Sequence, residues 1–396
     1  MKYCVVIMDG AAGWPLAERD NLSCLELAST PNLDAMAKEG RLGLGRTVPP
    51  GMEPSSACAC MSVLGYDPQV YYRGRSAIEA KSMGIPVSPD EVVFRCNLVA
   101  VSDGRMLSYS SGHISTPEAR QLIADIDKKL GNENIRFFPG VNYRHILKIR
   151  GHQDTLQAVC TPPHDITNQP VAGYLPKGPG SEFLRDLMSR SEEILRDHPV
   201  NTARKARGDI PATTIWLFWS SGQIPEMPSF LKVYGLKAAM TSGVDLLRGL
   251  ASMADMTILD IPGVTDNLDN DFAGQVEGAV KALKEHDLAV IHVEAPDEAG
   301  HAGSVEQKVL AIEKIDSEIL SRLRNWHEDE LRVLVMPDHP TPIKIQTHND
   351  EPVPFLLWGP GFKSNGAKRF SEKEAKYAGL LIDKGHAIMN YLLDKG

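Results

Sequence analysis

The feature that most limits the possible folds is a strand–helix–strand pattern in the last third of the chain. Residues 288–295 (LAVIHVEA) and 332–336 (RVLVM) are short apolar runs rich in β-branched residues, which predict buried strands. Between them, residues 305–326 carry apolar side chains at steps of three, four and seven, which predicts one apolar helical face. This unit requires a crossover and predicts a parallel sheet. Residues 3–8 predict another buried strand, and 213–218 are a fourth candidate.

Composition and charge narrow the class of protein. With 396 residues, of which 42% are hydrophobic and 23% charged, the chain is long enough for two or three globular domains. A net charge of -9 without a dense Lys/Arg block argues against nucleic-acid binding, which depends on phosphate neutralisation. The sequence contains no run of about 18 apolar residues, so no membrane-spanning helix is predicted. The scattered cysteines are typical of reduced thiols, so we expect a cytoplasmic protein.

The middle of the chain differs in pattern from its two ends. Between residues 90 and 149, short strand-like runs surround one predicted helix, and Pro and Gly are concentrated over 161–180. We therefore predict a smaller α+β domain at 88–180, inserted into an α/β sheet domain formed by 1–87 and 181–396. The Pro/Gly-rich stretch is interpreted as the exit linker of the inserted domain.

Acidic residues and histidines follow three of the predicted parallel strands. Asp9 follows the first strand, Asp297 the second, and Asp338 with His339 the third, and His348 comes shortly afterwards. The carboxyl ends of parallel strands meet at one edge of a sheet, where α/β proteins bind their ligands. We therefore expect these side chains to lie close together.

The chemistry of these residue types favours a pair of divalent cations. Neighbouring carboxylates repel one another unless cations neutralise them, and Asp combined with neutral His suits Zn²⁺ or Mn²⁺ better than Ca²⁺. Two such ions about 3.5–4 Å apart can bind both oxygens of a phosphoryl displacement. Each residue alone has a simpler interpretation, as a turn aspartate or a structural histidine, and the prediction depends on their common position.

A serine at a predicted helix start is the candidate nucleophile. The Pro/Gly-rich segment 49–54 leads into Ser55 and Ser56, and a short helix follows until Gly65. Free backbone N–H groups at a helix N-terminus stabilise an alkoxide or a phosphate. The simpler interpretation is a serine that only caps the helix, which contributes about 1 kcal/mol to stability.

Longer motifs resemble one enzyme family. They are Asp9-Gly10, the segment 51–68 (GMEPSSACACMSVLGYDP), Tyr72-Arg73-Gly74, Arg95-Cys96-Asn97, Tyr143-Arg144-His145, Pro163-His164-Asp165, 295–303 (APDEAGHAG), 337–342 (PDHPTP) and 351–354 (EPVP). In this order, over essentially the whole chain, they resemble the archaeal-type, cofactor-independent phosphoglycerate mutases of the alkaline phosphatase superfamily.

The resemblance implies a fold and a site. The fold would be an alkaline-phosphatase-like, mainly parallel sheet flanked by helices, with the inserted domain as a cap. Ser56 would be the nucleophile, and two Mn²⁺ or Zn²⁺ ions, or Mg²⁺ in their place, would bind without any need for 2,3-bisphosphoglycerate. One metal site would consist of Asp9, Ser56, Asp338 and His339, and the other of Asp297, His301 and His348. Matching motifs in the cap imply substrate contacts by Arg144, His145, His164 and Asp165.

The sequence departs from the family pattern beside the nucleophile. Ala57 stands where the family commonly has Asp, and Cys60 stands where it commonly has a polar residue. These differences leave the implied metal ligands in place but alter the substrate pocket.

Three functions are compatible with these observations. The first is interconversion of 3-phosphoglycerate and 2-phosphoglycerate through a phosphoserine. The second is a related metal-dependent phosphotransferase or phosphatase on another small substrate, such as a homoserine kinase-like enzyme. Because the P-loop motif GxxxxGK[ST] is missing, this second function would not be that of a P-loop kinase. The third is a degenerate member that binds without catalysis. A small phosphorylated molecule is the expected partner, with no nucleic acid and no membrane, and the oligomeric state is not defined.

Two lysines have contrasting interpretations. Lys237, in the segment Tyr234-Gly235-Leu236-Lys237, is a candidate for phosphate binding at the cleft. Lys308 lies among the charged residues of the helix at 305–324, which we interpret as a solvated outer face.

Overall fold

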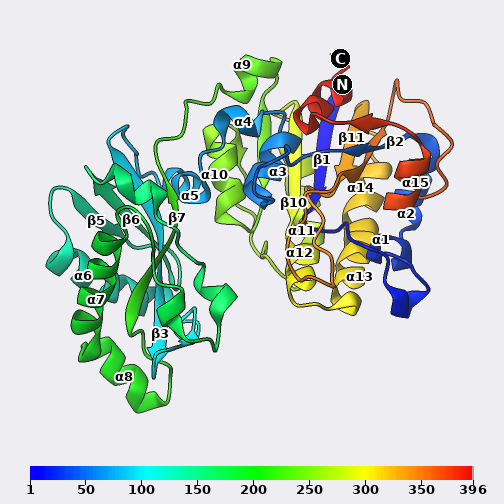
Figure 1. Ribbon diagram of the computed structural model, residues 1–396. Coiled ribbons are helices and arrows are strands. Elements are labelled where there is room, and N and C mark those ends of the chain that lie inside the picture. The colour runs from blue at the N-terminus through cyan, green and yellow to red at the C-terminus, as the bar shows by residue number, and fades with distance from the viewer. Residues whose placement is uncertain (395–396) are drawn as a thin grey trace. The chain divides into compact units, whose positions relative to one another are not determined.

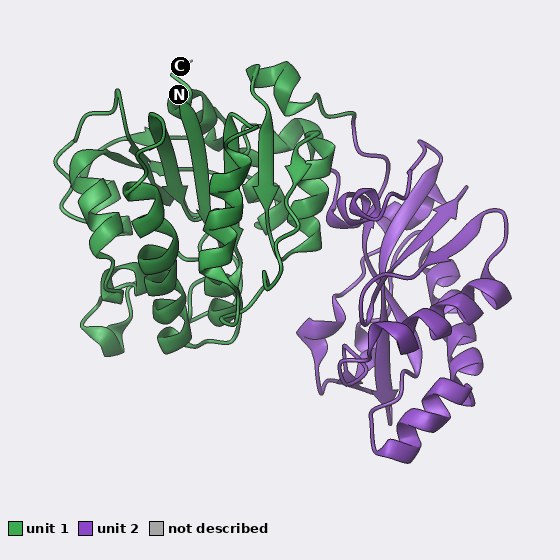
Figure 2. Cartoon of the chain, turned by 180° about the vertical axis from the view of Figure 1, so that it is seen from behind, with its two compact units in different colours: residues 1–72, 226–396 green, residues 73–225 purple. Residues whose placement is uncertain are grey.

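The computed structural model describes residues 1–394 and has two compact units (Figures 1 and 2). Unit 1 consists of residues 1–72 and 226–396, and unit 2 of residues 73–225. Unit 2 is thus an insertion in the sequence of unit 1, as expected, although its boundaries are wider than the predicted 88–180.

Unit 1 is built on a mainly parallel sheet. In its described residues, eight strands lie in the order β13-β2-β12-β11-β1-β10-β8-β9. The central strands β11, β1, β10 and β8 run parallel, whereas β12 is antiparallel to both of its neighbours. The bounds are β1 (Lys2–Met8), β2 (Arg41–Gly45), β8 (Ala238–Thr241), β9 (Thr257–Ile258), β10 (Leu288–Val293), β11 (Leu331–Met336), β12 (Val353–Trp358) and β13 (Leu381–Ile382). The predicted strands at 3–8, 288–295 and 332–336 are therefore confirmed.

Helices flank this sheet (Figure 1). They are α1 (Cys24–Leu27), α2 (Pro31–Glu39), α3 (Ser56–Val63), α4 (Pro68–Tyr71), α9 (Phe230–Tyr234), α10 (Asp245–Met253), α11 (Phe272–Ala282), α12 (Ala295–His301), α13 (Val305–Lys314), α14 (Ser321–Arg324), α15 (Glu372–Tyr377) and α16 (Ile388–Leu392). A π-helical turn, Ile315–Leu320, joins α13 to α14, so the predicted helix at 305–326 is continuous to Arg324. Because helices cover the central strands, Cys4–Met8 of β1 are fully buried and need no polar alternation.

Unit 2 is an α+β unit with an antiparallel sheet. Its long strand β3 (Glu91–Ser102) pairs with β6 (Arg144–Arg150), β7 (Thr214–Ser221) and β4 (Arg105–Ser108), and β5 (Ile135–Phe138) pairs with β6. Its helices are α5 (Arg75–Ser82), α6 (Thr116–Leu130), α7 (Ser181–Arg196) and α8 (Pro199–Arg207). The apolar stripes of α6 and α7 pack with alternate residues of β3 in one core, and α5 packs near Val93 of β3 in a second, smaller cluster.

The predicted domain boundaries were wrong because they ignored this packing. The strand at 213–218 was a candidate for the sheet domain, but as β7 it pairs with β3 of unit 2. Helix α7 follows the Pro/Gly-rich stretch and buries Leu184 and Leu187 in the same core. The stretch 161–180 is therefore an internal connection of unit 2, and Val159 bridges to Lys177 across it.

Among residues 1–394, no helix combines the length and the hydropathy that a membrane crossing requires. The cytoplasmic location stays a prediction.

Candidate metal centre

The carboxyl edge of the parallel sheet gathers three aspartates. Asp9 follows β1 directly, Asp338 lies two residues beyond β11, and Asp297 lies in the first turn of α12, which starts just after β10. All three are almost completely inaccessible to solvent. The topological prediction of a common sheet edge is therefore confirmed for these carboxylates.

Gly10 allows the strand-end loops to approach one another. Its φ of +60° lies in the left-handed region, and a Cβ at this position would lie 2.3 Å from Asp297 Oδ1. Its backbone N–H donates to Asp338 Oδ1 over 3.1 Å. A side chain here would separate the aspartates, so glycine is required by the close approach as well as by the turn.

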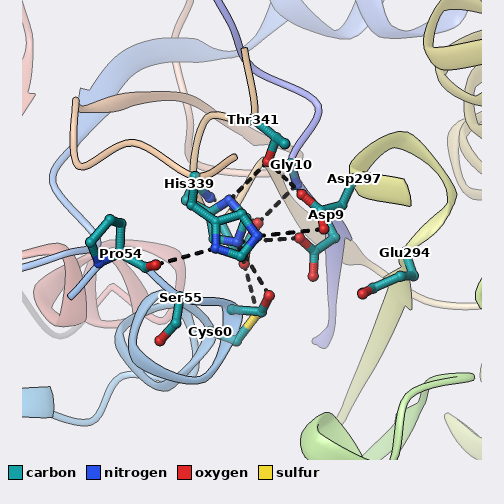
Figure 3. Close-up of polar contacts among 12 residues, drawn as sticks. Asp9, Gly10, Pro54, Ser55, Cys60, Glu294, Asp297, His339 and Thr341 are labelled. Carbon is teal, nitrogen blue, oxygen red and sulfur yellow. Dashed lines mark hydrogen bonds and ion pairs between the residues drawn. The ribbon is translucent and has the colours of Figure 1, made fainter. Parts of the chain in front are cut away.

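One group of donors surrounds Ser56. His339 Nε2 lies 3.2 Å from Ser56 Oγ, 3.3 Å from Asp338 Oδ2 and 3.5 Å from Asp9 Oδ1 (Figure 3). These are the residues that the family resemblance assigned to the first metal site, and Asp9, Asp338 and His339 offer ligand atoms close enough to hold one ion.

The structure gives different environments to the two serines that the helix-start pattern alone left open. Ser55 is the N-cap of α3, and its hydroxyl accepts a hydrogen bond from the Cys58 N–H. Its side chain points away from the cluster (Figure 3). Ser56 is the first residue of the helix and faces His339, so capping and proximity to the metal centre belong to different residues.

A second group of donors lies beside the first. Asp297 Oδ2 is 3.1 Å from His301 Nε2, which lies one helical turn along α12, and 3.6 Å from His348 Nε2. The Nε2 atoms of the two histidines are only 2.9 Å apart. His339 links the groups, since its ring centroid lies 4.1 Å from that of His348. The set predicted for the second metal site is thus together in space.

The unusual pKa values of these groups follow from burial and from the charges of their neighbours. Burial, reinforced by Asp338 and Asp297, raises the pKa of Asp9 well above its usual range. Asp297 is also buried, which alone would raise its pKa. The nearby His348 and His301 outweigh burial and hold the pKa of Asp297 well below its usual range. Burial lowers the pKa of His339 to about 4, whereas Asp297 outweighs burial and raises the pKa of His301 to about 9.

These observations fit a centre that holds divalent cations. Asp9 Oδ1 is buried and accepts no hydrogen bond, and two imidazole nitrogens converge on one Asp297 oxygen. The neutral form of His339 has a lone pair for coordination, and buried carboxylates need a compensating positive charge. Carboxylate and imidazole donors together match Zn²⁺ or Mn²⁺.

Residues that the sequence reasoning missed support this centre. His292 Nε2 lies 2.7 Å from Asp9 Oδ2, and the Thr341 hydroxyl donates to Asp297 Oδ1. Glu294 is nearby, and burial and the Asp9 charge raise its pKa well above its usual range. A signal was present, because His292 and Glu294 interrupt the otherwise apolar run at 288–295. Such partners orient metal ligands.

Lys308 contradicts the expected solvated position. It is fully buried, and its ammonium donates to the backbone oxygens of Thr341, over 2.7 Å, and of Ala12, over 3.1 Å. Burial lowers its pKa. Lys308 thus fixes the two loops that follow β1 and β11.

Replacing Lys308 by methionine is expected to destabilise the protein by about 2–4 kcal/mol, because two buried carbonyl groups lose their donor. Thermal unfolding of the variant measures this loss. Lys314→Met on the same helix is the control, since its half-exposed ion pair with Glu318 contributes less than about 1 kcal/mol. Equal melting temperatures of the two variants would contradict the role of Lys308.

In unit 2, the residues predicted to contact substrate do not share one environment. Arg144 is opposite Asn97, on the face of β3 that carries Arg95, and its guanidinium lies over the Tyr143 ring. His164 and Asp165 are exposed, and the His164 ring contacts those of Tyr109 and Trp219. His145, in contrast, lies on the opposite face of β6, toward the main core.

The face of β3 that carries Arg95 is cationic. Arg95 and Arg75 both pair with the buried Glu79, at 2.6 and 2.9 Å, and both guanidinium groups lie over the Trp219 ring. Burial would raise the pKa of Glu79, but Arg95 and Arg75 lower it. With Arg144 nearby, positive charge exceeds negative charge on this face, which therefore suits an anion.

His145 is only 1% exposed and has a structural environment. Its Nδ1 accepts a hydrogen bond from the Gly140 N–H over 3.0 Å, and burial, with a smaller contribution from Arg95, lowers its pKa to about 3. This position does not favour the predicted substrate contact.

The neutral state of His145 predicts acid sensitivity. Below a pKa of about 6.5 the unfolded chain binds a proton that the folded chain binds only near pH 3, so stability falls as the pH decreases. Between pH 6.5 and 4.5 the stability contributed by this group should fall by about 2 kcal/mol. His145→Asn keeps the acceptor and should remove this part of the pH dependence in guanidinium unfolding, whereas the exposed His113→Asn should not. Parallel profiles for both variants would contradict the prediction.

The position of Lys237 does not favour the predicted phosphate contact. Lys237 precedes β8, at the amino edge of the sheet, and its backbone N–H donates to Asp287, which precedes β10. The aspartates and histidines lie at the opposite, carboxyl edge. The Lys237 side chain is exposed to solvent.

Fold and site together define a class of protein. A mainly parallel sheet that gathers aspartates, histidines and a serine hydroxyl at its carboxyl edge is typical of metal-dependent enzymes that act on phosphate esters.

Comparisons with known proteins specify the family. The model of the 2,3-bisphosphoglycerate-independent phosphoglycerate mutase family matches residues 37–201. Enzymes of that name from Methanothrix thermoacetophila and Methanosarcina mazei are 43% and 42% identical, over 99% of this chain and all of theirs. The chain belongs to the family of 2,3-bisphosphoglycerate-independent phosphoglycerate mutases.

Solved structures agree with this assignment. A protein from Pyrococcus horikoshii superposes with a TM-score of 0.82 at 26% identity, covering 100% of this chain and 98% of its own. The cofactor-independent phosphoglycerate mutase from Thermoplasma acidophilum has a TM-score of 0.65 at 25% identity, with both chains fully covered. Family membership implies divalent metals, and the donor groups described above could hold them.

Proposed function

We propose that this protein interconverts 3-phosphoglycerate and 2-phosphoglycerate without 2,3-bisphosphoglycerate, through a phosphoserine at Ser56. The observation that carries the proposal is the Ser56 hydroxyl, which lies at the start of α3 and within 3.2 Å of His339 in the centre of the donor cluster. Family membership over the whole chain supports the same substrate class.

In the proposed reaction, Ser56 accepts the phosphoryl group and then returns it. The Ser56 Oγ forms a bond to phosphorus as the bond between phosphorus and the substrate oxygen breaks, and the released oxygen takes the proton that Ser56 loses. The glycerate then presents its other hydroxyl, and the same exchange in reverse gives the isomer. Free N–H groups in the first turn of α3 stabilise negative charge on the transferring group.

Asp9, Asp338, His339 and Ser56 would hold one divalent cation, and Asp297, His301 and His348 the other, with Mn²⁺ or Zn²⁺ as the proposed ions. Bound cations supply Lewis-acid stabilisation of the charge on the phosphoryl oxygens. His292 and Thr341 keep the carboxylates of Asp9 and Asp297 in their orientation.

The cationic face of unit 2 is the proposed source of substrate affinity. Arg75, Arg95 and Arg144 outnumber the single carboxylate of Glu79, and guanidinium groups bind carboxylates and phosphates through paired hydrogen bonds. Nearby, His164 and Asp165 remain proposed contacts.

The decisive experiment is a coupled assay of the purified, metal-loaded protein with 3-phosphoglycerate, enolase and no bisphosphoglycerate. Formation of phosphoenolpyruvate is the expected result. Failure to convert 3-phosphoglycerate while both metal sites are filled would overturn the proposed reaction.

One observation favours a second candidate function. Ala57, which replaces the common aspartate, is fully buried next to Ser56, so the protein lacks a carboxylate there. A related phosphatase or phosphotransferase would use the same serine with another small substrate. Release of inorganic phosphate from phosphate esters, or consumption of ATP with a small alcohol, in place of isomerisation would favour it.

A further inference from the structure

Cys60 lies on the same face of α3 as Ser56. The two residues are four positions apart, so successive helical turns direct both side chains toward the aspartates. Cys60 Sγ lies 3.4 Å from Asp338 Oδ2 (Figure 3), and Cys60, Asp9 and His292 offer ligand atoms within 4.8 Å of one another. The side chain is fully buried.

This environment differs from that of the neighbouring cysteine. Cys58 packs against Val48 and Ala59 in an apolar cluster, as an ordinary buried thiol does. Cys60 instead faces carboxylates, and two carboxylate oxygens of this cluster, Asp9 Oδ1 and Glu294 Oε2, are buried and accept no hydrogen bond. Buried carboxylates of this kind need a compensating positive charge.

The spacing of the sulfur also suits a shared ion. A Zn–S bond of about 2.3 Å and a Zn–O bond of about 2.1 Å at a tetrahedral angle put the two ligand atoms about 3.6 Å apart. The observed 3.4 Å between Cys60 Sγ and Asp338 Oδ2 is close to this value. His292 has a different role, because its Nε2 is already 2.7 Å from Asp9 Oδ2 and orients that carboxylate.

We propose that Cys60 is an additional ligand of the cation held by Asp9, Asp338 and His339, and that its sulfur makes this site selective for Zn²⁺ over Mn²⁺ and Mg²⁺. On binding, the S–H bond breaks, the proton leaves to solvent and a metal–sulfur bond forms, with no change of oxidation state. Thiolate is a soft ligand that favours Zn²⁺, whereas Mg²⁺ and Mn²⁺ prefer oxygen. The inference rests on the metal site of the proposed function.

X-ray absorption spectroscopy of the zinc-loaded full-length protein tests the proposal directly. A sulfur scatterer at about 2.3 Å is expected beside nitrogen and oxygen ligands. Cys60→Ala should remove it, and Cys58→Ala, on the same helix, should leave it unchanged. A sulfur-to-cobalt charge-transfer band of the Co²⁺-loaded protein should follow the same pattern across the three proteins.

Competition between metals tests the selectivity. The preference for Zn²⁺ over Mn²⁺, measured by equilibrium dialysis, should fall by about 10- to 100-fold in Cys60→Ala and stay unchanged in Cys58→Ala. Cys60→Ser keeps the size of the side chain and should resemble Cys60→Ala, because the oxygen does not replace the soft ligand.

The outcomes separate this proposal from the proposed function. A zinc-loaded wild-type protein that isomerises phosphoglycerate but shows only nitrogen and oxygen ligands would overturn the role of Cys60 alone. A wild-type protein that binds no divalent metal would overturn the proposed metal site as well. The X-ray absorption spectrum of the wild-type protein tests for the sulfur ligand even if a variant fails to fold.

Discussion

Replacing Ser56 by alanine is expected to lower kcat by at least about 10⁴-fold, because the proposed reaction has no other group to accept the phosphoryl. The remaining donors, Asp9, Asp338 and His339, stay in place, so the variant should still take up metal. Phosphorus NMR and intact mass should find phosphoserine in the wild-type protein during turnover and none in the variant.

Ser55→Ala is the matched control for this prediction. It removes the helix cap, which costs about 1 kcal/mol of stability, but leaves the hydroxyl that faces His339. Its kcat should stay close to that of the wild type while its melting temperature falls. Full activity of Ser56→Ala would exclude a covalent phosphoserine mechanism.

Removing the metals is expected to abolish activity and to lower the melting temperature by about 10 °C. A tightly bound ligand at 100 to 1,000 times its Kd contributes about 3–4 kcal/mol to stability, and a protein of this size loses a few degrees per kcal/mol. Without cations, burial and the repulsion among Asp9, Asp338 and Asp297 remain uncompensated.

Calorimetry of the chelated and the reloaded protein measures this effect. Readdition of Mn²⁺ or Zn²⁺ should restore both activity and melting temperature. Asp9→Asn offers a control, since it removes one of the repelling charges and should reduce the difference between the two states. A chelated protein that keeps its activity and melting temperature would contradict a metal centre.

Much of unit 1 could be predicted from local patterns. Runs such as 3–8 and 332–336 are apolar without alternation because helices bury both faces of a parallel sheet, and a residue just past such a strand must lie at its carboxyl edge. Asp9, Asp297 and Asp338 meet there for topological reasons. The motif resemblance then selected Ser56 over Ser55 and assigned His301 and His348 to the second metal site.

The remaining features depend on tertiary packing that no local pattern contains. The strand at 213–218 looks the same whether it joins one sheet or the other, and only its pairing with β3 decides. Lys308 resembles a surface lysine until the carbonyls of Ala12 and Thr341 surround it. His145 and Arg144 are adjacent in sequence, but successive residues of a strand point to opposite faces.

The strand order of unit 1 has a consequence for synthesis of the chain. Strand β1 is made first, but both of its neighbours, β10 and β11, come from the last third of the sequence. At about 5–20 residues per second, the ribosome needs roughly 15–60 s to add the intervening segment. Residues 73–225 are contiguous and leave the ribosome during this interval. Unit 2 can therefore complete its core co-translationally, whereas cation capture must wait for the end of translation.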